Sequence, residues 1–150
     1  MKFTATEDIA APIETVWARV SNFDGFEGAL KGRAREIRRS PDGPATPGTR
    51  WTATGTVLGK QRDVEITLDE MTVPTRVCAS GGSDGLSVVL DATLESLGPN
   101  RTRLTVTSEA KARTMTAKLM LKTASLAQGK MAERYGNRIE SFARRIEKSA

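Results

Sequence analysis

The most regular pattern of apolar side chains lies in the last third of the chain. From residue 114 to residue 148, these side chains recur in steps of three and four residues. They are Met120, Ala124, Ala127, Met131, Tyr135, Ile139, Phe142 and Ile146. Such spacing places side chains on one face of an α-helix, and no proline interrupts the segment. The pattern therefore predicts one long helix over residues 114–148.

Two features of this predicted helix depart from a simple apolar stripe. Gln128 projects close to the centre of the stripe, where a buried amide without a hydrogen-bond partner costs about 1–3 kcal/mol. Water or backbone could satisfy that amide, or a polar group on a ligand could. Small residues flank the stripe at Ser125, Gly129, Ala132, Gly136 and Ala143. They indicate either a close approach of backbone or ligand, or glycines tolerated at the surface.

The first 30 residues combine a strand with two short helices. Residues 2–9 alternate between apolar and polar side chains, which predicts a strand. Pro12 suits the first turn of a helix. Apolar side chains follow it with helical spacing at Ile13, Val16, Trp17 and Val20. Ser21 and Asn22 are suited to cap a second short helix, which contains glycine.

From residue 33 onward the pattern has a period of two. Stretches rich in glycine and proline separate the alternating segments and mark turns. The pattern predicts strands over residues 33–40, 49–58, 62–68, 75–80, 86–94 and 104–110. Because successive strands are joined by hairpin-like turns, the sheet is expected to be antiparallel.

The expected fold is α+β, with residues 1–150 forming a single domain. A curved antiparallel sheet of about seven strands would wrap around the long C-terminal helix, with two short helices after the first strand. A curled sheet and one helix do not fill the space between them, particularly beside a strip of glycine and alanine. A ligand cavity between sheet and helix is therefore expected.

Side chains on both walls of this cavity are candidates for ligand contact. The strand candidates are Trp51, Val64, Ile66, Val88, Leu90 and Val106. The helix candidates are Gln128, Met131 and Tyr135. A methionine adapts to ligands of different shape, and the tyrosine and the amide could fix orientation. Plain core packing explains each of these residues equally well.

The chain has no histidine and a single cysteine, Cys78. This composition removes histidine-activated nucleophiles and argues against zinc and iron–sulfur sites, so no metal and no cofactor is expected. No catalytic residue is assigned. Chemistry in the cavity would need an ionisable group, for which the candidates are Glu7, Arg62, Tyr135 and Arg138. Glu7 lies on the apolar side of the first strand, either near the rim at the strand end or inside the cavity.

The net charge is +5, and basic side chains crowd residues 31–39. This stretch is either a solvated face or a peripheral contact with an anionic surface. With only seven aromatic residues, few are left as stacking platforms, and no nucleic-acid partner is expected. Leu119 and Leu126 lie opposite the apolar stripe and suggest a partner subunit, such as a homodimer, or are scattered surface leucines. No signal-like start and no apolar run of about 18 residues is present, which favours the cytoplasm.

Two motifs and the order of elements resemble a known superfamily over essentially the whole chain. Residues 9–17 read Ile-Ala-Ala-Pro-Ile-Glu-Thr-Val-Trp, and residues 101–106 read Arg-Thr-Arg-Leu-Thr-Val. Both resemble the START-like or SRPBCC helix-grip superfamily, which includes birch-pollen-allergen-like and polyketide cyclase/dehydrase-like proteins. The resemblance implies a deep hydrophobic cavity for lipids, sterols, quinones, polyketides or hormones. It transfers no catalytic residue, because the superfamily has no universal catalytic motif.

Three functions follow as hypotheses. The first is a binding or carrier protein for a small hydrophobic ligand, such as a lipid, quinone or polyketide-like molecule, in the cavity. The second is a polyketide cyclase- or dehydratase-like enzyme that uses an ionisable group in that cavity. The third is a membrane-surface or protein interaction module that uses the basic residues 31–39.

Overall fold

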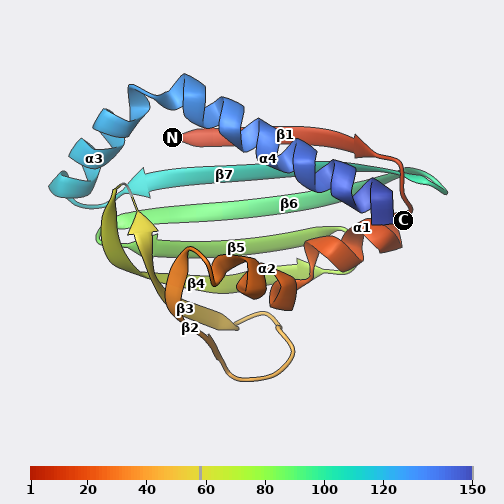
Figure 1. Cartoon of the computed structure of the whole chain (residues 1–150), viewed down its shortest axis with the longest axis horizontal. Coiled ribbons are helices and arrows are strands. Elements are labelled where there is room, and N and C mark those ends of the chain that lie inside the picture. The colour runs from red at the N-terminus through yellow and green to blue at the C-terminus, as the bar shows by residue number, and fades with distance from the viewer. Residues whose placement is uncertain (58, 150) are drawn as a thin grey trace.

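The computed structural model describes residues 1–57 and 59–149, and Figure 1 shows a curved sheet with helices on one face. The strands are β1 (Lys2–Ile9), β2 (Ala34–Ser40), β3 (Arg50–Val57), β4 (Lys60–Thr72), β5 (Arg76–Ser83), β6 (Leu86–Gly98) and β7 (Arg101–Ala112). The helices are α1 (Ile13–Val20), α2 (Phe23–Leu30), α3 (Met115–Ser125) and α4 (Gln128–Ser149). Leu58, at the end of the predicted strand 49–58, and Ala150, at the end of the predicted domain, lie outside the described residues.

The seven strands pair antiparallel in the order β1-β7-β6-β5-β4-β3-β2. Strands β2 to β7 follow one another as neighbours, whereas β1 lies at the far edge beside β7. The register aligns Ala5 with Val106, and Val106 with Ala92, so one set of alternating side chains forms a continuous face toward the helices. We call this the concave face. The predicted seven-stranded helix-grip fold is confirmed.

The basic residues 31–39 lead into and form most of β2, the edge strand of the sheet. The β2–β3 register shifts between Arg35 and Arg38, and both of these side chains are exposed. Charged side chains and an irregular register keep an edge strand from pairing with another chain. The basic stretch therefore has a structural explanation that does not involve a partner.

The helices after β1 begin as the sequence predicted. Pro12 occupies the N-cap position of α1, which buries Val16 and Val20. The Asn22 side chain caps α2 by accepting a hydrogen bond from the backbone N–H of Gly25 at 3.0 Å. No residue of α2 is buried, so this helix is attached to the protein through a few side chains rather than through a core.

The predicted single helix over residues 114–148 is wrong, because α3 ends at Ser125 and α4 begins at Gln128. At the end of α3 two backbone hydrogen bonds span three residues instead of the four of an α-helix. The N–H of Leu126 donates to the carbonyl of Thr123, and the N–H of Ala127 donates to the carbonyl of Ala124. The Ser125 hydroxyl also donates to the carbonyl of Lys122, which competes with helix continuation. The break lets α3 pack against the end of β7 while α4 crosses β1.

The densest core lies at the end of the molecule where α1 meets the C-terminal half of α4. Its buried members are Ile9, Ala11, Val16, Val20, Leu68, Val77, Ala92, Leu94, Leu104, Val106, Ala143 and Ile146. Thr102 is buried among them and donates a hydrogen bond from its hydroxyl to the carbonyl of Ala11 at 2.9 Å, which satisfies both polar groups.

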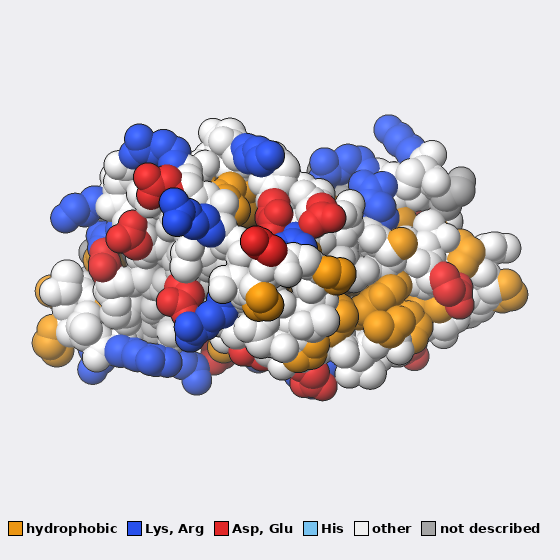
Figure 2. All heavy atoms as spheres, turned by 90° about the horizontal axis from the view of Figure 1, so that it is seen from below, with side chains coloured by type: hydrophobic (Ala, Val, Ile, Leu, Met, Phe, Trp, Pro, Cys, Tyr) orange, Lys and Arg blue, Asp and Glu red, His pale blue; other side chains and the backbone are white. Residues whose placement is uncertain are grey.

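Figure 2 shows the molecule from below, with mixed charges over much of this surface and hydrophobic side chains gathered right of centre.

Candidate functional site

The middle of the concave face is lined by apolar side chains that nothing covers completely. Ile66 on β4 is 37% exposed, and Val88 and Leu90 on β6 are 40% and 38% exposed. Unfilled space therefore adjoins all three side chains. We call this region the groove. The predicted strand candidates Trp51 and Val64 are half-buried on the same face, beside the groove.

Small residues on β5 deepen the groove between β4 and β6. The register places Gly81 between Ile66 and Val88, and Ala79 beside Leu90. A Cβ at Gly81 would stand 2.7 Å from the carbonyl oxygen of Glu65 and 3.2 Å from Cγ1 of Ile66. A larger side chain at this position therefore requires the backbone to move. The sequence reasoning did not include Ala79 or Gly81, although their alternation with the strand candidates could have identified them.

Tyr135 on α4 supplies the aromatic and polar part of the helix wall. Its ring stacks on Phe3 of β1 at a centroid distance of 5.6 Å, and its hydroxyl lies 3.0 Å from that of Ser108 on β7. Ser108 pairs with Leu90 in the register, so these hydroxyls belong to the same face as the groove. Met131, one turn earlier on α4, is half-buried.

Two predicted site residues lie elsewhere than expected. Gln128 is exposed at the first residue of α4, so its predicted place in the centre of a buried stripe is wrong. Within α4, Gln128 still shares the face of Tyr135, Ile139 and Ile146, but it is the first residue of the helix, where that face is exposed. Val106 is 7% exposed and belongs to the packed core next to Ala92. The glycines Gly129 and Gly136 have open space around them, so no backbone approaches them closely.

A chain of aromatic rings connects the sheet to α4 through α2. Trp51 lies 5.5 Å from Phe23, Phe23 lies 6.5 Å from Phe26, and Phe26 lies 6.2 Å from Phe142, measured between ring centroids. We call these four side chains the aromatic bridge. Aromatic pairs at such distances attract one another by about 0.5–1.5 kcal/mol beyond their burial. The bridge therefore holds α2 across one side of the concave face.

An ion-pair cluster beside the aromatic bridge also holds α2. The Glu27 carboxylate accepts hydrogen bonds from Nε of Arg39 at 2.7 Å and from the indole N–H of Trp51, and Asp24 accepts from Arg39 at 2.6 Å. Burial of the Arg39 side chain opposes its charge, but the hydrogen bonds to Glu27 and Asp24 outweigh that effect and raise its pKa. Arg39 thus stays charged and ties α2 to β2.

The opposite end of the groove is bounded by α3. Arg62 on β4 donates to Asp84 at 2.8 Å and contacts the sulfur of Met120 on α3 at 3.2 Å. Its side chain is only 10% exposed. Leu86 and Ala117 are buried at the same end, where α3 packs against the end of β7.

The four ionisable candidates do not form a catalytic group. Glu7 faces Arg144 of α4 at 3.6 Å, which supports its predicted position at the rim of the strand end. Arg62 is engaged with Asp84, Tyr135 lies against Ser108, and Arg138 is exposed. No two of the four are joined by a hydrogen bond or ion pair among the contacts of the described residues.

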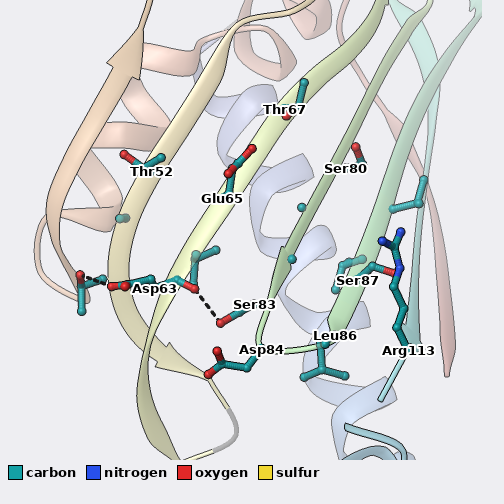
Figure 3. Close-up of a pocket in the computed structure, with 18 of the residues that line it drawn as sticks. Thr52, Asp63, Glu65, Thr67, Ser80, Ser83, Asp84, Leu86, Ser87 and Arg113 are labelled. Carbon is teal, nitrogen blue, oxygen red and sulfur yellow. Dashed lines mark hydrogen bonds between the residues drawn. The ribbon is translucent and has the colours of Figure 1, made fainter.

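A second hollow, with a volume of about 920 Å³, lies on the outer face of the sheet (Figure 3). In this view the helices lie behind the sheet, and the labelled side chains come mainly from β3, β4, β5 and β6. They are largely hydroxyls and charged groups, namely Thr52, Asp63, Glu65, Thr67, Ser80, Ser83, Asp84, Ser87 and Arg113. Val64 and Val88 also border the hollow, although alternation directs their side chains away from those of Glu65 and Val89. This polar, open surface is a poor match for a hydrophobic ligand.

A family model described as polyketide cyclase / dehydrase and lipid transport matches residues 1–147. A norcoclaurine synthase mutant from Thalictrum flavum has a TM-score of 0.69 at 9% identity, over 99% of this chain and 95% of that one. An aromatase/cyclase from a Streptomyces species has a TM-score of 0.66 at 16% identity, over 97% and 94%. A START superfamily protein from Mycobacterium smegmatis has a TM-score of 0.59 at 17% identity, over 93% and 97%. No curated protein sequence matches the chain.

Proposed function

The chain belongs to the START-like helix-grip superfamily, in the family of polyketide cyclases, dehydrases and lipid-transport proteins. On this premise we propose that it binds and carries a small hydrophobic ligand in the groove. The observation that carries the proposal is the incomplete burial of Ile66, Val88 and Leu90 on the face that the helices cover elsewhere. Apolar side chains that adjoin unfilled space favour a ligand that removes them from water, by about 25 cal/mol per Å².

The groove also suggests the chemical character of the ligand. Its walls are aliphatic on β4 and β6, and we propose that Trp51, Met131 and Tyr135, all half-buried, border it. One of the paired hydroxyls of Tyr135 and Ser108 donates to the other, and the accepting hydroxyl keeps its own O–H to donate to a carbonyl or hydroxyl of a ligand. We therefore propose a mainly apolar molecule with a polar group at one end, such as a quinone, a polyketide-like compound or a lipid. Ligand contact stays a prediction for Val106, which is packed in the core, and for Gln128, which is exposed at the first residue of α4.

A cyclase- or dehydratase-like activity is the second proposal. It is favoured by the largely buried guanidinium of Arg62 and the hydroxyl of Tyr135 on the concave side, both of which could polarise a carbonyl oxygen. The absence of a paired acid and base among the four ionisable candidates makes it secondary to carriage. Incubation with aromatic polyketide analogues, followed by mass spectrometry of the products, would distinguish turnover from simple binding.

Native mass spectrometry of protein purified from its own host tests the carrier proposal. Val88→Trp would fill the groove, whereas Val89→Trp adds the same side chain at the neighbouring position on the outer face of β6. We expect the wild type and Val89→Trp to retain a co-purified small molecule and Val88→Trp to lose at least about 90% of it. Denaturant unfolding of both variants ensures that a loss is not due to misfolding.

Two results would contradict the proposal. One is full ligand occupancy in folded Val88→Trp, and the other is loss of the ligand in Val89→Trp alone.

We further propose that the protein works in the cytoplasm, a reducing setting that fits the single cysteine, Cys78, whose thiol is free. Burial is the main cause that raises the pKa of this thiol, which makes it less reactive than an exposed one.

A further inference from the structure

Helix α3 has two apolar faces, and only one of them packs against the protein. The inner face carries Ala117, which is fully buried, and the half-buried Met120, Leu121 and Ala124. The outer face carries large apolar side chains that are 72%, 63% and 88% exposed, at Met115, Leu119 and, at the helix end, Leu126. Since one turn takes about 3.6 residues, positions 115, 119 and 126 align on one side, opposite Ala117 and Ala124.

Basic side chains dominate the sequence on both sides of α3 and within it. Between Glu109 and Glu133 the sequence has no acidic residue and five basic ones. They are Lys111, Arg113, Lys118, Lys122 and Lys130, and all five are exposed. Asp84, an acidic residue at the same end of the sheet, is paired with Arg62. We call the outer apolar side chains together with Lys118 and Lys122 the α3 patch. Figure 2 shows hydrophobic side chains at the left-hand tip, the end at which Figure 1 draws α3.

We infer that the α3 patch docks on the surface of an anionic lipid bilayer. A helix with exposed large apolar side chains and flanking lysines is suited to lie at the headgroup boundary, with the lysines beside anionic headgroups. The positive charge of the patch attracts an anionic surface, whereas a second copy of the same basic patch would be repelled. No helix among residues 1–57 and 59–149 is long and apolar enough to cross a membrane, so the contact is peripheral.

The docking site is placed differently from the one that the sequence suggested. The basic residues 31–39 occupy edge strand β2, where Arg39 is committed to Asp24 and Glu27. Residues 31–39 include no large apolar side chain that is exposed. The preceding residue, Leu30 at the end of α2, is 41% exposed, which is less than Met115, Leu119 or Leu126. The α3 patch combines exposed apolar side chains with positive charges in one helix.

The position of α3 connects docking with the groove. Met120 faces Arg62 at the end of the groove, while Leu119, the preceding residue, points outward. A bilayer held against α3 would therefore lie close to one end of the groove. The use of this contact for ligand exchange rests on the proposed function, but vesicle binding does not require a groove ligand.

Sedimentation with extruded vesicles of phosphatidylcholine alone, or of phosphatidylcholine with 30% phosphatidylglycerol, tests the inference at about 50 mM and 300 mM salt. We expect binding to the anionic vesicles that weakens with salt. Lys118→Gln with Lys122→Gln should lower the partition coefficient roughly 30-fold, since each lysine near the surface contributes about fivefold. Leu119→Gln should lower it about tenfold, because an amide replaces a leucine that the bilayer would bury.

Matched controls remove the same groups from other places. Arg33→Gln with Arg35→Gln removes two exposed charges from the β2 region, and Val73→Gln removes a side chain that is 64% exposed at the β4–β5 turn. Val73→Gln should change the partition coefficient by less than about twofold. The double arginine variant should lower it by less than about fivefold, because its charges lie away from the proposed contact. All variants alter exposed positions, so thermal unfolding should stay close to that of the wild type.

Three outcomes would overturn the inference. They are equal binding to neutral and anionic vesicles, a larger loss from the arginine control than from the lysine pair, and a stable dimer in light scattering that Leu119→Gln dissociates. The last would show that a second copy covers the α3 patch. Failure of vesicle binding would leave ligand retention in the groove unaffected, so the two proposals fail separately.

Discussion

The two ends of the concave face have the same alternating pattern but differ in how they are packed. On β6, Ala92 and Leu94 are 6% and 5% exposed, whereas Val88 and Leu90, on the same face of the same strand, are 40% and 38% exposed. On β4, Leu68 is fully buried and its neighbour on this face, Ile66, is 37% exposed. Strand patterning therefore decides which side chains face the helices, and the helices decide which of them are buried.

The difference follows from where the helices lie. Helix α1 and the end of α4, through Val16, Ala143 and Ile146, fill the space over the core. Away from the core, α4 lies over β1 at the edge of the sheet, and the middle strands carry small side chains such as Ala79 and Gly81 of β5. The aromatic bridge and α3 bound the resulting groove without filling it. This separates a region that stabilises the fold from one that is free to take a ligand.

The largest expected effect comes from truncating the same residue type at the two ends. Leu94→Ala should lower the free energy of unfolding by about 3 kcal/mol, because it leaves a cavity in a packed core. Leu90→Ala should lower it by less than about 1 kcal/mol, because that side chain already adjoins unfilled space. Urea denaturation of both variants measures the difference. Equal losses would contradict the distinction between core and groove.

Glu27→Gln tests how α2 is held over the groove. The variant weakens the hydrogen bonds to Arg39 and Trp51 and removes one ion pair, although Asp24 still accepts from Arg39. We expect a loss of about 1–2 kcal/mol and faster amide hydrogen exchange in α2. The matched control is Glu65→Gln, whose partner Arg50 is exposed, and it should change stability by no more than about 0.5 kcal/mol. Unchanged exchange in α2 would show that the aromatic bridge alone holds this helix.

Tyr135→Phe keeps the stacking on Phe3 and removes the hydroxyl beside Ser108. We expect the free energy of unfolding to fall by about 1 kcal/mol or less, and the affinity for a ligand with a polar end to fall about fivefold. Isothermal titration with the co-purified ligand measures the affinity. Ser108→Ala is the control, because it leaves the tyrosine hydroxyl in place. An unchanged affinity in both variants would remove these hydroxyls from the proposed site.

The smallest expected effect is a pH dependence at the packed end. Hydrogen bonds from Arg103 and then Arg101 lower the pKa of Asp8, and they join β1 to β7. A lowered pKa stabilises the folded protein above the unfolded value of about 3.9, and this contribution is lost as pH falls through the folded value. Asp8→Asn should therefore flatten the loss of stability below about pH 4. Asp42→Asn, in the exposed β2–β3 loop, should leave the acid profile as steep as in the wild type.

Much of the architecture could be predicted because burial repeats with the period of each element. The alternation from residue 33 onward predicted the strands, and the motif around Pro12 predicted the first helix. The helix break could not be predicted from apolar spacing, because Ala124, Ala127 and Met131 continue the steps of three and four across it. Gln128 has the helical position that the spacing predicted, but its exposure at the start of α4 depends on where the helix begins.

The site was harder to predict than the fold because it depends on contacts between distant elements. Ile66, Val88 and Leu90 were expected on the concave face, but their incomplete burial depends on the position of α4. The contact between Tyr135 and Ser108 requires the register of β7 and the rotation of the helix. The aromatic bridge was missed, because the spacing of Phe23 and Phe26 within a short helix does not reveal their contacts with Trp51 and Phe142.

Methyl NMR during titration with 1-anilinonaphthalene-8-sulfonate, a hydrophobic fluorescent probe, tests most directly whether the groove takes a ligand. We predict that the methyl resonances of Ile66, Val88 and Leu90 shift together and saturably. Those of Leu68 and Leu94 in the core, and of Val89 on the outer face, should shift far less. Shifts concentrated at Val89, or a titration that leaves Val88 and Leu90 unchanged, would contradict the assignment of the groove as the ligand-binding site.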